Sequence, residues 1–307
     1  MIYLKNETLK EKVLITGYHG SLAKIVSNIL TSYNYEIAYL TTNKKKCANN
    51  IFYWNIENKY IEPGALINTK HIIHLAGFNI ENLWTKKNKD IMFSSRVHTS
   101  KLLYSECCKL NVKIKTFISA SAMGYYGFNQ KGLKKEKEQA GTDWMANLCV
   151  AWENAADRFK AMGARVTKLR LALLISKNSG ILARICLGFK FKLGIVFGDG
   201  SQHFPWIHIE DAAKFISQTM INKSIHGVFN VASPQHISYY HFIHTAKKIK
   251  YRNSILITIS KSIINVFFPN KKFLLLNNIQ LSIEKMKKVG FQWGHPTIEQ
   301  ALKKELQ

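Results

Sequence analysis

The segment Lys12-Val13-Leu14-Ile15-Thr16-Gly17-Tyr18-His19-Gly20-Ser21-Leu22-Ala23 decides how this chain folds. Its first five residues form a short apolar run that ends at a glycine, which predicts a buried β-strand. After Gly20, apolar side chains recur at Leu22, Ile25, Val26, Ile29 and Leu30. This spacing predicts a helix with one buried face. Residues 36–40 predict a second strand, so the segment opens a β–turn–α–β unit.

Strand and helix patterns alternate along much of the remaining chain. The predicted strands are residues 71–77, 115–121, 165–174 and 227–231, and the predicted helices are residues 86–110, 143–162 and 208–220. This alternation predicts an α/β fold with a Rossmann doubly wound parallel sheet. We expect residues 1–236 to form the Rossmann domain, with a substrate-side insertion at 176–209. Residues 237–307 then form a small, mostly helical C-terminal lobe.

The composition is that of a globular protein, because 47% of the 307 residues are hydrophobic and 12% are aromatic. The five cysteines contain no C-x-x-C pair, which argues against a disulfide framework or a zinc site and favours a reducing cytoplasm. No apolar run has the length of a membrane-spanning helix, so we expect no membrane partner. The net charge of +25 comes from scattered lysines, so we expect no specific nucleic acid, with nonspecific polyanion binding as the alternative.

The glycine loop between the first strand and helix has the chemistry of a pyrophosphate site. A strand that turns sharply into a helix offers free N–H groups and the positive end of the helix dipole. Glycines at Gly17 and Gly20 permit the turn and a close approach of backbone to phosphate, and Ala23 lets the helix pack on the sheet. The predicted cofactor contacts in this loop are Gly17, Tyr18, His19, Gly20, Ser21 and Leu22.

The end of the second strand favours NADP over NAD. NAD sites place an acid there for the ribose 2′-hydroxyl, whereas NADP sites offer cationic or hydroxyl groups to the 2′-phosphate. The sequence Leu40-Thr41-Thr42-Asn43-Lys44-Lys45-Lys46 contains no acid. We therefore predict that Thr42, Asn43 and Lys44 contact NADP, with NAD as the alternative cofactor. The alternative interpretation is that the lysines belong to a solvated loop.

Several segments together resemble a known family. They are Thr16-Gly17-x-x-Gly20-x-x-Ala23, Leu75-Ala76-Gly77, Ser119-Ala120-Ser121-Ala122-Met123-Gly124-Tyr125-Tyr126-Gly127, Trp206-Ile207-His208-Ile209-Glu210-Asp211 and Phe229-Asn230-Val231-Ala232-Ser233-Pro234. This set resembles the extended or atypical short-chain dehydrogenase/reductases, and within them the "epimerase family" of NAD(P)-binding proteins with a short C-terminal domain of unknown function. The resemblance implies a bound NADP or NAD and a substrate lobe over the carboxyl ends of the strands. It adds Leu75, Ala76, Gly77 and Ser119 to the expected cofactor contacts, and it leaves the substrate open.

The sequence departs from the catalytic pattern of the classical members. These members use a Tyr-x-x-x-Lys pair, in which the tyrosine transfers a proton and the lysine grips the ribose. With Glu153 as the anchor of the alignment, Met145 and Cys149 occupy those two positions, and neither side chain can do that chemistry. Ser121 matches the family's substrate-orienting serine, and Tyr125 is the candidate proton donor, with packing beneath the lobe as its alternative role.

Four other polar residues have no single predicted role. His208 and Asp211 lack a third metal ligand nearby in the sequence, so we predict no metal. Arg96 and Arg170 are either anion contacts or members of buried ion pairs. We therefore expect an NADP(H)-dependent oxidoreductase or epimerase/dehydratase-like enzyme that acts on a small polar substrate in the cytoplasm. The alternative is a non-catalytic NADP(H)-binding sensor or interaction protein, and the oligomeric state stays open.

Overall fold

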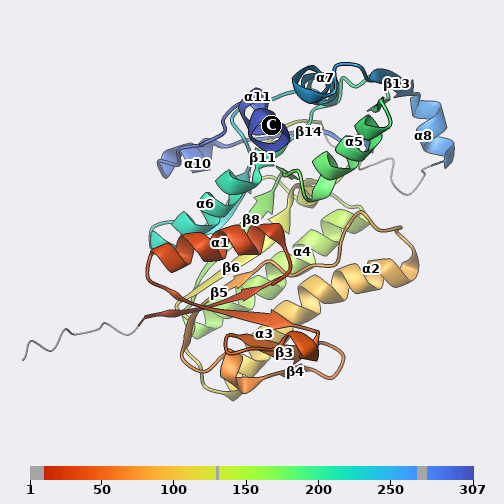
Figure 1. Ribbon diagram of the computed structural model, residues 1–307. Coiled ribbons are helices and arrows are strands. Elements are labelled where there is room, and N and C mark those ends of the chain that lie inside the picture. The colour runs from red at the N-terminus through yellow and green to blue at the C-terminus, as the bar shows by residue number, and fades with distance from the viewer. Residues whose placement is uncertain (1–9, 129–130, 268–274) are drawn as a thin grey trace, which may run out of the picture.

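A central eight-stranded sheet organises the molecule, as the computed structural model shows for residues 10–128, 131–267 and 275–307 (Figure 1). Its strands are β1 (Lys12–Thr16), β2 (Glu36–Thr41), β3 (Ile51–Asn55), β4 (Tyr60–Ile61), β5 (Thr69–His74), β6 (Thr116–Ala122), β8 (Arg165–Leu171) and β12 (Gly227–Val231). Their order is β12-β8-β6-β5-β1-β2-β3-β4, and all neighbours are parallel except β3 and β4. The predicted Rossmann doubly wound sheet is confirmed.

Helices cover both faces of the sheet, because successive residues of a buried strand point to opposite sides. In β1, Val13 and Ile15 pack with α1 (Ser21–Ser32) and α6 (Ile209–Ile221) on one face. The intervening Leu14 packs in a second core on the other face. The helices of that face are α2 (Lys86–Phe93), α3 (Thr99–Lys109) and α4 (Trp144–Asp157) (Figure 1). One π-helical turn, Ser94–His98, joins α2 to α3 within the predicted helix 86–110.

The C-terminal part packs as a third cluster at one end of the sheet. Leu182 and Phe189 of the predicted insertion share an apolar core with Phe242 and Leu302. The helices here are α5 (Gly180–Lys190), α7 (Tyr239–Lys250), α8 (Lys261–Phe267), α10 (Glu284–Lys288) and α11 (Ile298–Leu306). Among the described residues, three short parallel pairs lie outside the central sheet, namely β9 (Leu173–Ile175) with β11 (Trp206–His208), β10 (Leu193–Phe197) with β13 (Ile255–Ile259), and β7 (Lys131–Lys134) with β14 (Asn278–Leu281).

The mostly helical character expected of the C-terminal lobe is confirmed, although the sequence pattern missed its strands β13 and β14. Residues 268–274 of that predicted lobe lie outside the described residues. In the part of the chain that the structure describes, no helix is both long and apolar enough to cross a membrane. The carboxyl ends of β1, β5 and β6 meet at one edge of the sheet, which is where open α/β proteins bind their ligands.

Candidate functional site

The glycine turn after β1 touches the loop after β5 through backbone alone. Gly17 has φ +84°, and a Cβ there would lie 3.2 Å from the carbonyl oxygen of Leu75 and the amide nitrogen of Ala76. Gly20 begins α1, and its amide donates a 2.8 Å hydrogen bond to the carbonyl of Gly17. No side chain caps α1 and its first turn carries no acid, so its first amides and its positive dipole end are free for an anion.

The Thr16 hydroxyl fixes this arrangement by joining the two strand ends. Its oxygen accepts hydrogen bonds of 3.0 Å from the amides of Leu75 and Ala76, and its proton faces Nδ1 of His74 at 2.8 Å. Nε2 of His74 in turn lies 3.1 Å from the hydroxyl of Thr99 and 3.3 Å from the carbonyl of Arg96. These partners require a proton on Nε2 and a lone pair on Nδ1, so His74 is neutral. Burial lowers the pKa of His74 to about 4.

The segment after β2 is built as the NADP interpretation requires, with donors and no acid. The amide of Asn43 donates to Thr41 at 3.2 Å, and the Asn43 side chain accepts from the amide of Lys45 at 3.0 Å. Thr42, Asn43 and Lys44 are exposed, and the Lys44 ammonium lies 4.9 Å from the centre of the Tyr53 ring. The loop is ordered by its own hydrogen bonds while its cation faces solvent.

Tyr18, a bulky residue of the glycine loop, packs against two other aromatic rings. The ring of Tyr18 packs 5.0 Å from the ring of Tyr39 on β2 and 4.8 Å from that of His19. The neighbouring strand β6 places Ser119 opposite His74, and the Ser119 hydroxyl donates to the Ala120 carbonyl at 2.8 Å. The predicted cofactor residues of β1, β5 and β6 therefore gather at one edge of the sheet.

Ser121 belongs to a buried ionic network rather than facing open space. Its hydroxyl donates to Oε1 of Glu153 at 2.8 Å, and only 2% of the residue is exposed. Arg170 grips the same carboxylate with two hydrogen bonds of 2.8 and 3.1 Å, and Lys168 lies 3.9 Å away. The Glu153 carboxylate raises the pKa of Arg170, although burial opposes it. Arg170 is therefore the ion-pair member that one of the two sequence interpretations required.

The two tyrosines after Ser121 differ in their partners. The Tyr126 hydroxyl donates to Asn230 at 2.7 Å and accepts from Arg170 at 3.0 Å, and burial raises its pKa to about 12. The guanidinium of Arg170 also stacks 3.2 Å from the centre of the Tyr125 ring. Tyr125 is half-buried, and within residues 10–128, 131–267 and 275–307 its hydroxyl makes no hydrogen bond. Tyr125 thus keeps a phenol that a ligand can use.

Met145 and Cys149, at the positions of the family's catalytic pair, are buried beneath Gly124. A Cβ on Gly124 would lie 2.5 Å from Cγ of Met145 and 3.8 Å from the sulfur of Cys149. Burial raises the pKa of Cys149 to about 12. Neither side chain can exchange a proton with a ligand near neutral pH, which agrees with the expectation that Met145 and Cys149 cannot do the chemistry of the classical pair.

Arg96 is a cation that has carbonyl partners instead of an acid. It donates to the carbonyls of Phe78 at 3.0 Å and Met92 at 3.1 Å, and it lies 5.2 Å from the Trp152 ring. Among the described residues no carboxylate forms an ion pair with it, and burial lowers its pKa to about 10. A Cβ on Gly77 would approach its guanidinium carbon to 2.9 Å, so Arg96 lies directly under the loop after β5.

A glycine turn, an uncapped helix start and clustered strand ends define a dinucleotide-binding protein of the Rossmann class. The model of the NAD dependent epimerase/dehydratase family matches residues 13–232, and the chain belongs to this family. Epimerase family protein YfhF of Bacillus subtilis is 30% identical over 78% of this chain and 80% of that relative. Epimerase family protein ML0860 of Mycobacterium leprae is 26% identical over 95% of both chains.

Solved structures share the fold at lower identity. Human epimerase family protein SDR39U1 (isoform 2), solved with NADPH, superposes with a TM-score of 0.83 at 22% identity, over 96% of this chain and 98% of that one. UDP-glucuronic acid 4-epimerase from Bacillus cereus, solved with NAD, gives 0.75 at 15% identity, over 96% and 97%. At these identities the likeness establishes the fold.

Replacing Gly17 with alanine tests the backbone contact between the two loops. We expect Gly17→Ala to lower the free energy of unfolding by about 1–3 kcal/mol, since the new methyl group adds a collision to the strain of a positive φ. Gly163→Ala is the matched control, because Gly163 has φ +78° with nothing within 4 Å of the added Cβ. Urea unfolding of both variants measures the difference, and equal losses would contradict the close contact.

Acid should destabilise the fold through His74. The unfolded chain takes up a proton near pH 6.5, whereas folded His74 takes it up only near pH 4. The stability is therefore fully present above about pH 6.5 and is lost as the pH falls toward 4, by about 3 kcal/mol in all. Urea unfolding between pH 7 and 4.5 should show a flatter dependence for His74→Asn than for the exposed control His98→Asn. Identical slopes in the two variants would refute this assignment.

Proposed function

We propose that this chain binds NADP(H) in preference to NAD(H) and uses it as an oxidoreductase or epimerase/dehydratase-like enzyme on a small polar substrate. The observation that carries the proposal is the uncapped start of α1, held beside the loop after β5 by Thr16 and Gly17. The amides of Ser21 and Leu22 meet the pyrophosphate there. The neighbouring structures, one solved with NADPH and another with NAD, support the same cofactor class.

The preference for NADP rests on charge at the end of β2. Exposed Lys44 and the hydroxyl of Thr42 provide donors for a 2′-phosphate, and no acid in this segment opposes it. The bound cofactor would supply hydride transfer, and the protein would orient the substrate and handle its proton. Ser121 and Tyr125 are the candidate catalytic residues.

The contacts of Ser121 and Tyr125 suggest different roles for them. Because the Ser121 hydroxyl is committed to Glu153, it supports the proposal mainly by holding the carboxylate that fixes Arg170. Arg170 underlies the ring of Tyr125, whose unpartnered phenol is placed to exchange a proton with a substrate oxygen. Arg96, which has no acid partner in the described chain, is available to a carboxylate or phosphate group of the substrate.

Titration with both nucleotides tests the cofactor proposal. We expect NADPH to bind more tightly than NADH, and Lys44→Glu to weaken NADPH binding about tenfold or more while leaving NADH binding unchanged, because the 2′-phosphate loses a cationic partner. Lys288→Glu, at an exposed position of α10, makes the same charge change as a control. Equal affinities of the unmodified chain for NADPH and NADH would refute the preference.

Measurements of turnover test the roles of Ser121 and Tyr125. With a panel of nucleotide sugars and small carbonyl compounds, we expect Tyr125→Phe to lower kcat about 100-fold or more with unchanged NADPH affinity. Ser121→Ala should abolish most turnover too, and it should also destabilise the fold because Glu153 loses a buried partner. Tyr33→Phe, 61% exposed, is the control. A Tyr125→Phe enzyme as fast as the unmodified one would exclude Tyr125 as the proton donor.

A second function is favoured by one specific observation, the buried Met145 and Cys149 where catalytic members have tyrosine and lysine. In this alternative the chain binds NADP(H) as a non-catalytic sensor or interaction protein. NADPH binding without oxidation across the whole substrate panel would support the sensor over the enzyme.

A further inference from the structure

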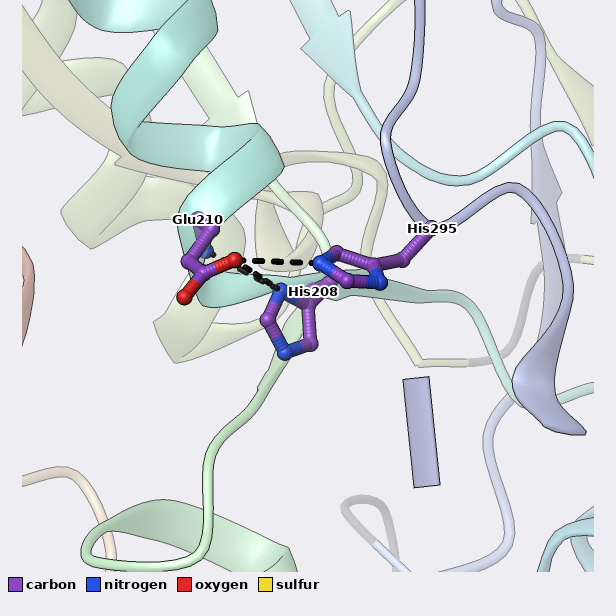
Figure 2. A group of neighbouring side chains, drawn as sticks. All are labelled: His208, Glu210 and His295. Carbon is purple, nitrogen blue, oxygen red and sulfur yellow. Dashed lines mark hydrogen bonds and ion pairs between the residues drawn. The ribbon is translucent and has the colours of Figure 1, made fainter. Parts of the chain in front are cut away.

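Two histidines and a glutamate from distant parts of the sequence converge where α6 begins. His208 ends β11 and precedes α6, Glu210 lies in the first turn of α6, and His295 lies in the segment before α11. Figure 2 shows the three side chains pointing toward one another. One ligand atom from each lies within 4.8 Å of the other two. Oε2 of Glu210 is 3.0 Å from Nε2 of His295 and 4.0 Å from Nδ1 of His208.

The hydrogen bonds of His208 define its tautomer. Its Nε2 donates to Oε1 of Glu305 at 2.9 Å, and its Nδ1 accepts a 3.3 Å hydrogen bond from the amide of Glu210, so a metal ion at Nδ1 would replace this cap of α6. Both contacts select the tautomer with the proton on Nε2. A carboxylate behind a histidine in this way is the usual support of a metal-ligating imidazole, because it fixes the tautomer and the ring orientation. Glu305 is itself held by the amide of Lys177 at 2.5 Å.

The backbone that carries His295 is fixed as well. Both oxygens of Asp211 accept hydrogen bonds from this backbone, at 2.7 Å from the amide of Gly294 and at 2.9 Å from that of His295. The His208 side chain is fully buried, whereas 19% of the His295 side chain and 44% of the Glu210 side chain are exposed. The cluster is therefore closed at its base and open on one side, where a water molecule can complete a coordination shell.

The residues around the cluster carry more negative than positive charge. Glu210, Asp211 and Glu305 contribute three carboxylates, and Lys304 lies 3.8 Å from Glu210, so with neutral imidazoles the local charge is −2, from three negative charges and one positive. This local excess of negative charge is opposite in sign to the net charge of the chain, which is +25. The positive end of α6 offsets it only by about half a charge. A divalent cation would balance the remainder.

We propose that His208, Glu210 and His295 bind Zn²⁺, with water as the fourth ligand. Imidazole nitrogens with one carboxylate suit zinc, whereas magnesium and calcium prefer all-oxygen shells. Zinc bonds of about 2.0–2.2 Å place tetrahedral ligands about 3.4 Å apart, so the 4.0 Å separation of Glu210 and His208 needs to close by about 0.6 Å, and no pair of ligand atoms, all within 4.8 Å, needs to close by more than about 1.4 Å. Zinc takes the place of the proton between His295 and Glu210, and His295 then carries its proton on Nδ1. The bound Zn²⁺ would link the start of α6 to the C-terminal segment.

Calorimetric titration of the untagged full chain with Zn²⁺, after removal of metals by a chelator, tests the site. We expect one equivalent of Zn²⁺ to bind and to raise Tm, and the same concentration of Mg²⁺ to do neither. His295→Gln should weaken Zn²⁺ binding at least 100-fold, and Glu305→Gln should weaken it about 10- to 100-fold because the support of His208 is lost. Circular dichroism checks that each variant is folded.

The exposed pair of His241 and Glu299 provides the matched control. Their side chains approach to 3.0 Å like His295 and Glu210, with 46% and 44% of each exposed, but they are not part of the three-ligand cluster. His241→Gln should leave Zn²⁺ binding unchanged. Co²⁺ should give visible absorption typical of four-coordinate cobalt in the unmodified chain and lose it in His295→Gln. No saturable uptake, or undiminished uptake in His295→Gln, would overturn the proposal.

Discussion

The hydroxyl group of Thr16 is the contact on which the candidate site depends. A parallel sheet brings strand ends to one edge but does not fix the loops that follow them. Thr16 does so, because its oxygen accepts the amides of Leu75 and Ala76 while its proton is directed to His74. The loop after β5 is thereby drawn so close to Gly17 that no side chain fits between them. The start of α1 has no side-chain cap among the described residues, and it lies beside the loop after β5, which is held by Thr16.

A second buried network surrounds Glu153 on α4. Glu153 lies one helical turn beyond Cys149, which occupies the position of the classical lysine, and it binds Arg170 and Ser121 instead of a ligand. Removing either ion-pair partner would leave an uncompensated buried charge, which makes such a network expensive to alter. Its effect on function is indirect, since Arg170 sets the position of Tyr125 and hydrogen-bonds Tyr126.

The sequence predicted the features that depend on neighbours along the chain. Six strands of the central sheet, the glycine turn and the segment free of acids after β2 all follow from local patterns, whereas β3 and β4 at the end of that sheet were not predicted. The short strands β13 and β14 were missed, because each pairs with a strand more than 60 residues away, β10 or β7, and carries too few residues for a clear period. The partners of polar side chains were missed for the same reason: nothing local connects His74 with Thr99, or His208 with His295.

The surroundings of His208 illustrate how topology adds what spacing along the sequence lacks. In sequence, His208 and Asp211 had no third ligand, but Asp211 serves to hold the backbone of His295, which brings an imidazole to the start of α6. That helix packs against α1 through the core residues Phe215 and Ile216, beside Val26 and Leu30. The hydrogen bonds of Asp211 therefore join the C-terminal segment to the helix that packs against α1. The C-terminal segment thus contributes to the dinucleotide site through packing, although it lies far from the glycine loop in sequence.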